Sequence, residues 1–159
     1  MWWIAAIALA AEPDVRVEPD GTVVATVVVA AQPTAVRALL ADGVDATRLS
    51  PDVYGVQATP AGDCQVLDKE TRGVFRPFHL RTRRCPTAAG WTETLVGSDD
   101  FTAFRSSVEV APAGDATRVT YRVRTSLAIP VPQAALNRSV SDSARVLLDN
   151  LVRRLLPFR

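Results

Sequence analysis

The spacing of hydrophobic and polar residues at the start of the chain predicts one strand followed by two short helices. A valine-rich run comes directly after a Glu-Pro-Asp-Gly turn sequence and has the composition of a strand. Pro33 suits the first position of a helix, and the apolar residues that follow it fall on one helical face. We therefore expect a strand at residues 22–30 and helices at residues 34–41 and 46–49.

Between residues 52 and 127 the pattern changes to short runs rich in Val, Thr, Phe and Tyr, separated by clusters of Pro, Gly and Asp. Such runs are typical of antiparallel strands joined by turns. In the last run Val119, Tyr121 and Val123 alternate with polar residues, which predicts a strand with one buried face and one solvent-exposed face. The strands predicted here cover residues 53–59, 64–69, 75–84, 91–96, 101–110 and 117–127.

The apolar spacing becomes helical after residue 132. Apolar residues recur at intervals of three and four with charged residues opposite, which predicts an amphipathic helix of about six turns. The first half of this helix carries small or polar residues, and the second half is rich in leucine. We expect Leu147, Leu151 and Leu155 to pack on the sheet, whereas Leu136 and Val140 should roof a pocket.

These elements predict an α+β fold in which a curved antiparallel sheet wraps around the long C-terminal helix. A length of 159 residues suits one domain, and 48% hydrophobic with 22% charged residues is an ordinary globular composition. The formal net charge of +1 argues against a strongly basic nucleic-acid binder. We expect residues 12–159 to form a monomeric domain that binds no nucleic acid and has no stable membrane span.

The first eleven residues, MWWIAAIALAA, form an uncharged apolar run. The run is too short to span a bilayer, which takes about 20 apolar residues. Its length and small-residue end are typical of a secretory signal peptide, although no Lys or Arg precedes it. We interpret residues 1–11 as an export signal of a bacterial protein, bound for the periplasm or the exterior. The alternative is a first strand or helix of the fold.

Cys64 and Cys85 are the only cysteines, and the chain has a single histidine, so the usual zinc ligand sets cannot be assembled. We expect neither a metal nor a cofactor. An even number of cysteines in an exported protein favours a disulfide. In a hairpin that pairs the two cysteines, Asp68 falls opposite Arg81, so the charges complement each other. The alternatives are two buried free thiols and a redox-active pair.

His79 is the only histidine, and histidine is the usual general base near neutral pH. Strand alternation places His79 on the solvent-exposed face of the sheet, whereas Phe78 points to the buried face. This argues against a catalytic role for His79. Five nearby arginines form either a binding stripe for phosphate or an anionic headgroup, or a solvated strand face. Arg76 is expected to turn inward, toward a carboxylate of ligand or protein. The five are Arg72, Arg76, Arg81, Arg83 and Arg84.

The order of one strand, two short helices, a run of antiparallel strands and one long helix resembles the helix-grip fold of the START-like superfamily, also called SRPBCC. This superfamily includes polyketide cyclase and dehydrase-like proteins and lipid-transfer domains. The resemblance covers residues 21–156. Its sharpest local piece is the segment GDATRVTY at residues 114–121, similar to a Gly-Thr-Arg-Val-Thr-Tyr turn and strand of the family. The Ile-Pro-Val-Pro entry to the last helix is similar to members that bind lipids.

The resemblance implies that a hydrophobic small molecule or lipid is held between the sheet and the C-terminal helix. A second interpretation is a cyclase-like or dehydratase-like enzyme, in which an inward Arg76, Glu93 or Tyr121 transfers protons. A third is a filled domain that binds only protein partners. We name no catalytic residue, and our candidates for ligand binding are Tyr54, Arg76, Phe78, Leu80, Trp91, Phe104, Tyr121, Leu136 and Val140.

Overall fold

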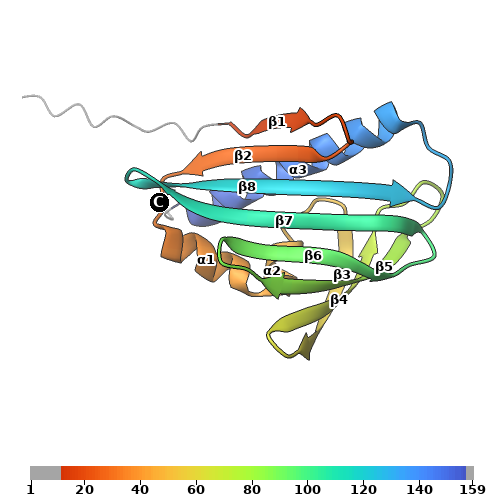
Figure 1. Cartoon of the computed structure of the whole chain (residues 1–159), viewed down its shortest axis with the longest axis horizontal. Helices are drawn as coiled ribbons and strands as arrows, with labels where there is room; N and C mark the ends of the chain where they lie inside the picture. The colour runs from red at the N-terminus through yellow and green to blue at the C-terminus, as the bar shows by residue number, and fades with distance from the viewer. Residues whose placement is uncertain (1–11, 157–159) are drawn as a thin grey trace, which may run out of the picture.

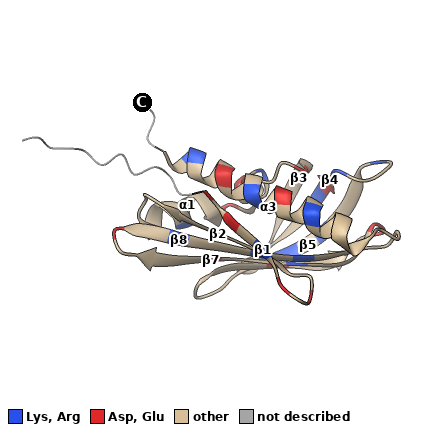
Figure 2. Ribbon diagram, turned by 90° about the horizontal axis from the view of Figure 1, so that it is seen from above, with Lys and Arg blue, Asp and Glu red and all other residues tan. Residues whose placement is uncertain are grey.

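The computed structural model describes residues 12–156, so the predicted signal peptide lies outside the described residues. The described chain folds into one sheet of eight strands with three helices over one face (Figures 1 and 2). This arrangement confirms the predicted helix-grip fold. The helices are α1 (Pro33–Ala41), α2 (Gly43–Thr47) and α3 (Gln133–Leu155).

The sheet is antiparallel throughout, in the order β1-β2-β8-β7-β6-β5-β4-β3. Strands that follow one another in the chain are also adjacent in the sheet, with one exception. Between β2 and β3, helices α1 and α2 carry the chain to the opposite edge of the sheet. The first and last long strands therefore pair side by side. The strands are β1 (Asp14–Val17), β2 (Val23–Val29), β3 (Val53–Ala61), β4 (Cys64–Thr71), β5 (Phe78–Pro86), β6 (Gly90–Gly97), β7 (Phe101–Ala113) and β8 (Ala116–Leu127).

Most elements lie within three residues of their predicted limits, and local features explain the differences at β1, α2 and β5. The unassigned residues before the first turn form β1, which pairs with β2 through a turn at Gly21, where φ is 88°. The second helix begins earlier than predicted, because the Asp42 carboxylate accepts the backbone N–H groups of Val44 and Asp45 at 2.8 and 3.1 Å. Strand β5 begins at Phe78, because Pro77 precedes it and residues 74–76 form a bend.

The hairpin of β4 and β5 forms in the predicted register. Cys64 and Cys85 are joined by a disulfide, as predicted, so they are not the two free thiols of the alternative. Asp68 lies opposite Arg81, and their side chains pair at 2.8 Å between Oδ1 and Nε. The covalent link and the charge pair therefore fix two of the strands that α3 does not cover.

The hydrophobic core lies where α1 and the second half of α3 cover β2 and β8. Val119, Leu148 and Leu151 are 0% exposed, and Val27 is 2% exposed. Helix α3 packs mainly against β2 and β1, so it lies toward one edge of the sheet rather than over its middle. Packing of the second half is confirmed: Leu151 is completely buried, and Leu147 and Leu155 are half-buried against the same core. Leu148, which the prediction did not include, is also completely buried.

Candidate functional site

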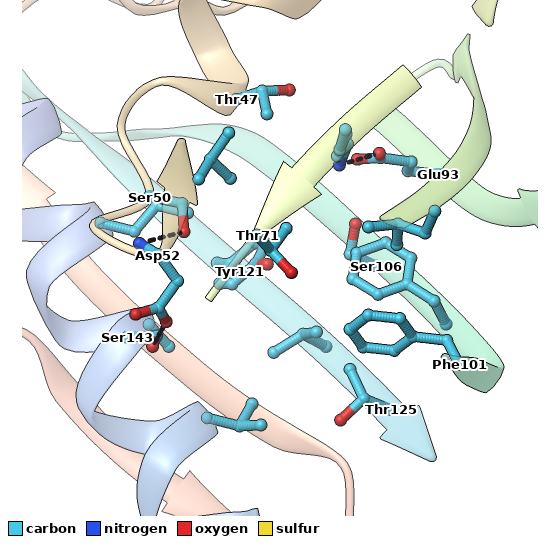
Figure 3. A pocket seen from close by; sticks show the side chains of 18 of the residues that line it. Thr47, Ser50, Asp52, Thr71, Glu93, Phe101, Ser106, Tyr121, Thr125 and Ser143 are labelled. Carbon is cyan, nitrogen blue, oxygen red and sulfur yellow. Dashed lines mark hydrogen bonds and ion pairs between the residues drawn. The ribbon is translucent and has the colours of Figure 1, made fainter. Parts of the chain in front are cut away.

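A cavity of about 380 Å³ lies between α3 and the sheet. Its walls come from strands β3 to β8, from the residues around α1 and α2, and from the first two thirds of α3 (Figure 3). Most of these wall residues are apolar. Four of them are exposed and mark the mouth: Arg72 and Val74 between β4 and β5, and Ala135 and Ser139 in the first half of α3.

The cavity persists because α3 presents small side chains to it. Ala135, Ser139, Ser143 and Ala144 line the cavity from this helix, and none of them is long enough to fill the space. Leu147 packs against the core, as predicted, and also lines the cavity. At helical spacing, Leu147 lies one turn after Ser143, where the packed half of the helix begins.

Seven of the nine candidate ligand-binding residues line this cavity. They converge from β5, β6, β7, β8 and α3, although they are spread over more than sixty positions of the sequence. Burial of one strand face and the helical spacing were enough to select them. The seven are Phe78, Leu80, Trp91, Phe104, Tyr121, Leu136 and Val140.

Tyr54 does not line the cavity. Its side chain is 59% exposed, whereas the neighbouring Val53 faces the interior. The pairing of β3 with β4 shifts between Val53 and Gly55, and this irregularity breaks the alternation at Tyr54. The inward position predicted for Tyr54 is therefore wrong.

Arg76 also lies outside the cavity, in the bend before β5. It meets a carboxylate, as predicted, but that carboxylate belongs to the protein: Asp100 accepts from Arg76 at 2.6 Å. Asp100 also accepts the backbone N–H of His79 at 2.8 Å. These contacts lower the pKa of Asp100, the His79 N–H contributing most and Arg76 adding to it. The group anchors the β4–β5 loop to the turn between β6 and β7.

A buried ion pair forms the polar part of the cavity wall. The Lys69 ammonium pairs with the Glu93 carboxylate, which also accepts from the Thr82 hydroxyl. The side chains of Lys69 and Glu93 are 7% and 12% exposed, and Lys69 lies 5.1 Å from the centre of the Phe104 ring. The pair supplies fixed charge and hydrogen-bonding capacity beside an apolar cavity.

Lys69 is a wall residue that our sequence reasoning missed. It is the only lysine of the chain, and it lies two residues after the buried Leu67 on β4, so strand alternation points it inward. That position was the available signal. A lysine on a buried face needs a carboxylate partner. That partner is Glu93 on β6, which is separated from β4 by the strand β5.

Tyr121 lies on β8 and lines the cavity together with Ser106 of the neighbouring strand β7. Burial raises the pKa of the Tyr121 phenol well above its ordinary value, and the negative charge of Glu93 raises it further, while Ser106 opposes the shift. The phenol therefore stays protonated at neutral pH. It can donate a hydrogen bond to a ligand oxygen, but it is unsuited to accept a proton.

Arg84 is buried, in contrast to the exposed Arg72, Arg76, Arg81 and Arg83. Its guanidinium donates to the backbone oxygens of Leu40 and Ala41 at the end of α1, and it lies 4.9 Å from the centre of the Trp91 ring. Burial lowers the pKa of Arg84, against the opposing effects of Glu93 and Asp42. Unpaired carbonyls at a helix end attract cations, so Arg84 fixes α1 on the cavity wall.

The mouth carries its own polar group. The Ser143 hydroxyl on α3 donates to the Asp52 carboxylate, which also pairs with Arg72 at 3.2 Å (Figure 3). Asp52 precedes β3 and Arg72 follows β4, so this group joins the helix to the uncovered edge of the sheet. His79 faces outward, as alternation predicts. Within residues 12–156 no cluster of three metal-ligating side chains occurs.

The fold and this cavity define a START-like, helix-grip protein. The sequence profile of the polyketide cyclase / dehydrase and lipid transport family matches residues 20–156, so the chain belongs to that family. No functionally curated protein matches the chain in sequence.

Solved structures show the same fold at low sequence identity. A START superfamily protein from Mycobacterium smegmatis aligns with a TM-score of 0.74 at 19% identity, over 84% of this chain and 96% of that one. A STAR-related lipid transfer protein from Xanthomonas axonopodis aligns with a TM-score of 0.63 at 15% identity, over 91% and 99% of the two chains. The Zhui aromatase/cyclase of a Streptomyces species aligns with a TM-score of 0.60 at 17% identity, over 89% and 96%.

Proposed function

We propose that this protein binds and carries a hydrophobic small molecule or lipid in the cavity between α3 and the sheet. The observation that carries the proposal is a cavity of about 380 Å³ with mainly apolar walls and a mouth. Ligand pockets in proteins commonly measure about 300 to 1,000 Å³ and combine apolar walls with a few polar groups. The Lys69–Glu93 pair and the Tyr121 phenol are those polar groups here.

The test of carriage is uptake of the apolar fluorophore N-phenylnaphthylamine by the purified protein. Val140 faces the cavity, so Val140→Trp should fill part of it and weaken uptake at least several-fold with little loss of stability. Val146 lies on the outer side of the same helix and is 39% exposed, so Val146→Trp is the matched control. Uptake that is absent from the parent, or equal in both variants, would contradict the proposal. Native mass spectrometry of protein from its own host would then identify the natural ligand.

A second candidate function is a cyclase-like or dehydratase-like reaction on a hydrophobic substrate. The specific observation in its favour is the position of Glu93, Lys69 and the protonated Tyr121 on one wall of the cavity. The test compares Glu93→Gln and Tyr121→Phe with the parent, using the co-purified ligand. Enzyme action requires that the parent convert the bound molecule to a product, which loses water in a dehydration or keeps its mass but changes its chromatographic retention in a cyclisation. The variants should leave the molecule unchanged.

We further propose that residues 1–11 are an export signal and that residues 12–159 are the mature domain. The apolar run with its small-residue end supports this, and so does the Cys64–Cys85 disulfide, because disulfides persist in oxidising compartments. N-terminal sequencing of periplasmic or secreted material should begin near Ala11 or Glu12. Material that begins at Met1 would contradict cleavage.

A further inference from the structure

The loop between β4 and β5 displays an aromatic side chain at the cavity mouth. Phe75 is 94% exposed, and its neighbour Val74 is 53% exposed. Across the mouth, the connection from β8 to α3 adds Ile129, which is 37% exposed, followed by the exposed Pro130. Figure 1 shows both connections at the same end of the molecule. Water therefore meets several apolar side chains at the place where a ligand would enter.

Several contacts hold this loop in position, so the exposure of Phe75 is part of the fold. The backbone N–H of Arg72 donates to the backbone carbonyl oxygen of Asp52 at 2.8 Å, and the Arg76 side chain is bound to the Asp100 carboxylate at the other end. Between them the chain turns tightly at Gly73, where an added Cβ would lie 1.9 Å from the Arg76 oxygen. Phe75 lies between these fixed points and contributes nothing to the buried core.

Around Phe75, the positively charged side chains are exposed and their negatively charged partners are more deeply buried. The side chains of Arg72 and Arg76 are 63% and 61% exposed, whereas those of their partners Asp52 and Asp100 are 26% and 5% exposed. The guanidinium groups therefore face solvent, and the carboxylates lie beneath them. No acidic residue occurs between Glu70 and Glu93, so the loop itself presents only positive charge.

We propose that this end of the protein docks on an anionic lipid surface, with Phe75 inserted among the lipids and Arg72 and Arg76 at the phosphate level. An exposed aromatic residue between arginines suits the membrane interface, where apolar side chains enter the lipid and cations remain with the headgroups. The docked mouth would open directly toward the bilayer. This inference rests on the proposed carriage of a lipid-like ligand, because docking lets the ligand move between membrane and cavity without crossing water.

The test is co-sedimentation of the full chain with vesicles of phosphatidylcholine alone, or of phosphatidylcholine with phosphatidylglycerol. The parent should bind the anionic vesicles more tightly, and salt should weaken that binding. Phe75→Ser should weaken it about tenfold, because the inserted apolar surface is lost. Val146→Ser is the matched control, since Val146 is 39% exposed on the outer side of the second half of α3.

All three proteins carry the same apolar residues 1–11, so that run cannot produce a difference among them. Equal binding of the parent, Phe75→Ser and Val146→Ser would overturn the docking proposal, as would binding that does not depend on lipid charge. Loss of fluorophore uptake in Phe75→Ser with unchanged vesicle binding would also overturn it, because Phe75 would then act as a lid. A third outcome separates the two proposals: the parent takes up no fluorophore, but its vesicle binding still depends on Phe75. That outcome would refute carriage and support docking. Melting temperatures confirm that each variant is folded.

Discussion

The two halves of α3 lie over the same sheet in different surroundings. In the second half, Leu148 and Leu151 are completely buried among the valines of β2 and β8. In the first half, Ser139 and Ser143 face a cavity instead of a packed layer. The comparison teaches that one amphipathic helix can both close a core and cover a cavity, because the size of its inward side chains changes along its length.

The largest difference is expected when one side chain from each half is truncated. Leu151→Ala should destabilise the protein by about 2 to 5 kcal/mol, the usual effect of emptying a packed site. Val140→Ala should cost clearly less, because Val140 already borders empty space. Urea unfolding of both variants measures the difference. Equal losses would show that the first half is also packed, and the comparison would fail.

The strands beyond the reach of α3 should depend on their covalent link. The Cys64–Cys85 disulfide spans 21 residues, and a link of that span contributes about 3 kcal/mol in the chain-entropy description. We expect the variant with both cysteines changed to serine to lose stability by about that amount. Reducing agent should destabilise the parent and leave the double variant unchanged. If reduction leaves the parent's melting temperature unchanged, packing alone holds this half.

A smaller effect is expected at acid pH near the mouth. The pKa of Asp100 is lowered in the fold, chiefly by the His79 N–H, so its charged form stabilises the native state. That contribution is present above the ordinary aspartate pKa of about 4 and is lost as pH falls through the lower folded value. In a plot of melting temperature against pH, the fall at acid pH should therefore be less steep for Asp100→Asn than for the parent. Asp99→Asn, at the exposed neighbour, should keep the parent's curve.

The smallest effect should appear only in strong alkali, at the cavity wall. Because the pKa of Tyr121 is raised in the fold, its neutral form is the stabilising one. The contribution is complete below the ordinary tyrosine pKa of about 10 and is lost as pH rises above it. In a Tyr54→Phe background, phenolate absorbance should develop together with unfolding. Ionisation of Tyr121 in protein that remains folded would show that its hydroxyl is open to water.

Much of the fold followed from periodicity, because each element has one buried face. The alternation in β8 and the helical spacing of α3 predicted both elements, and the hairpin register followed from pairing Cys64 with Cys85. Short β1 was missed, since four largely exposed residues have no apolar pattern.

The candidate site was predictable where alternation holds and failed where it breaks. Phe78 and Leu80 lie in a regular strand, so their inward position could be counted along the sequence. Tyr54 lies at a shift of register and Arg76 in a bend, and neither feature is visible in the hydrophobic pattern. The Lys69–Glu93 pair joins residues on β4 and β6, and such a contact depends on the sheet order.

The pairing of β2 with β8 also bears on the order in which the protein folds. Val23 lies opposite Val123, so these strands meet only after about 100 intervening residues are available. Contacts between distant segments slow folding, because the chain loses much conformational freedom before they form. The valine core shared by the two strands therefore cannot form until almost the whole chain has been made. If residues 1–11 act as the proposed export signal, this delay would keep the chain unfolded while it crosses the membrane.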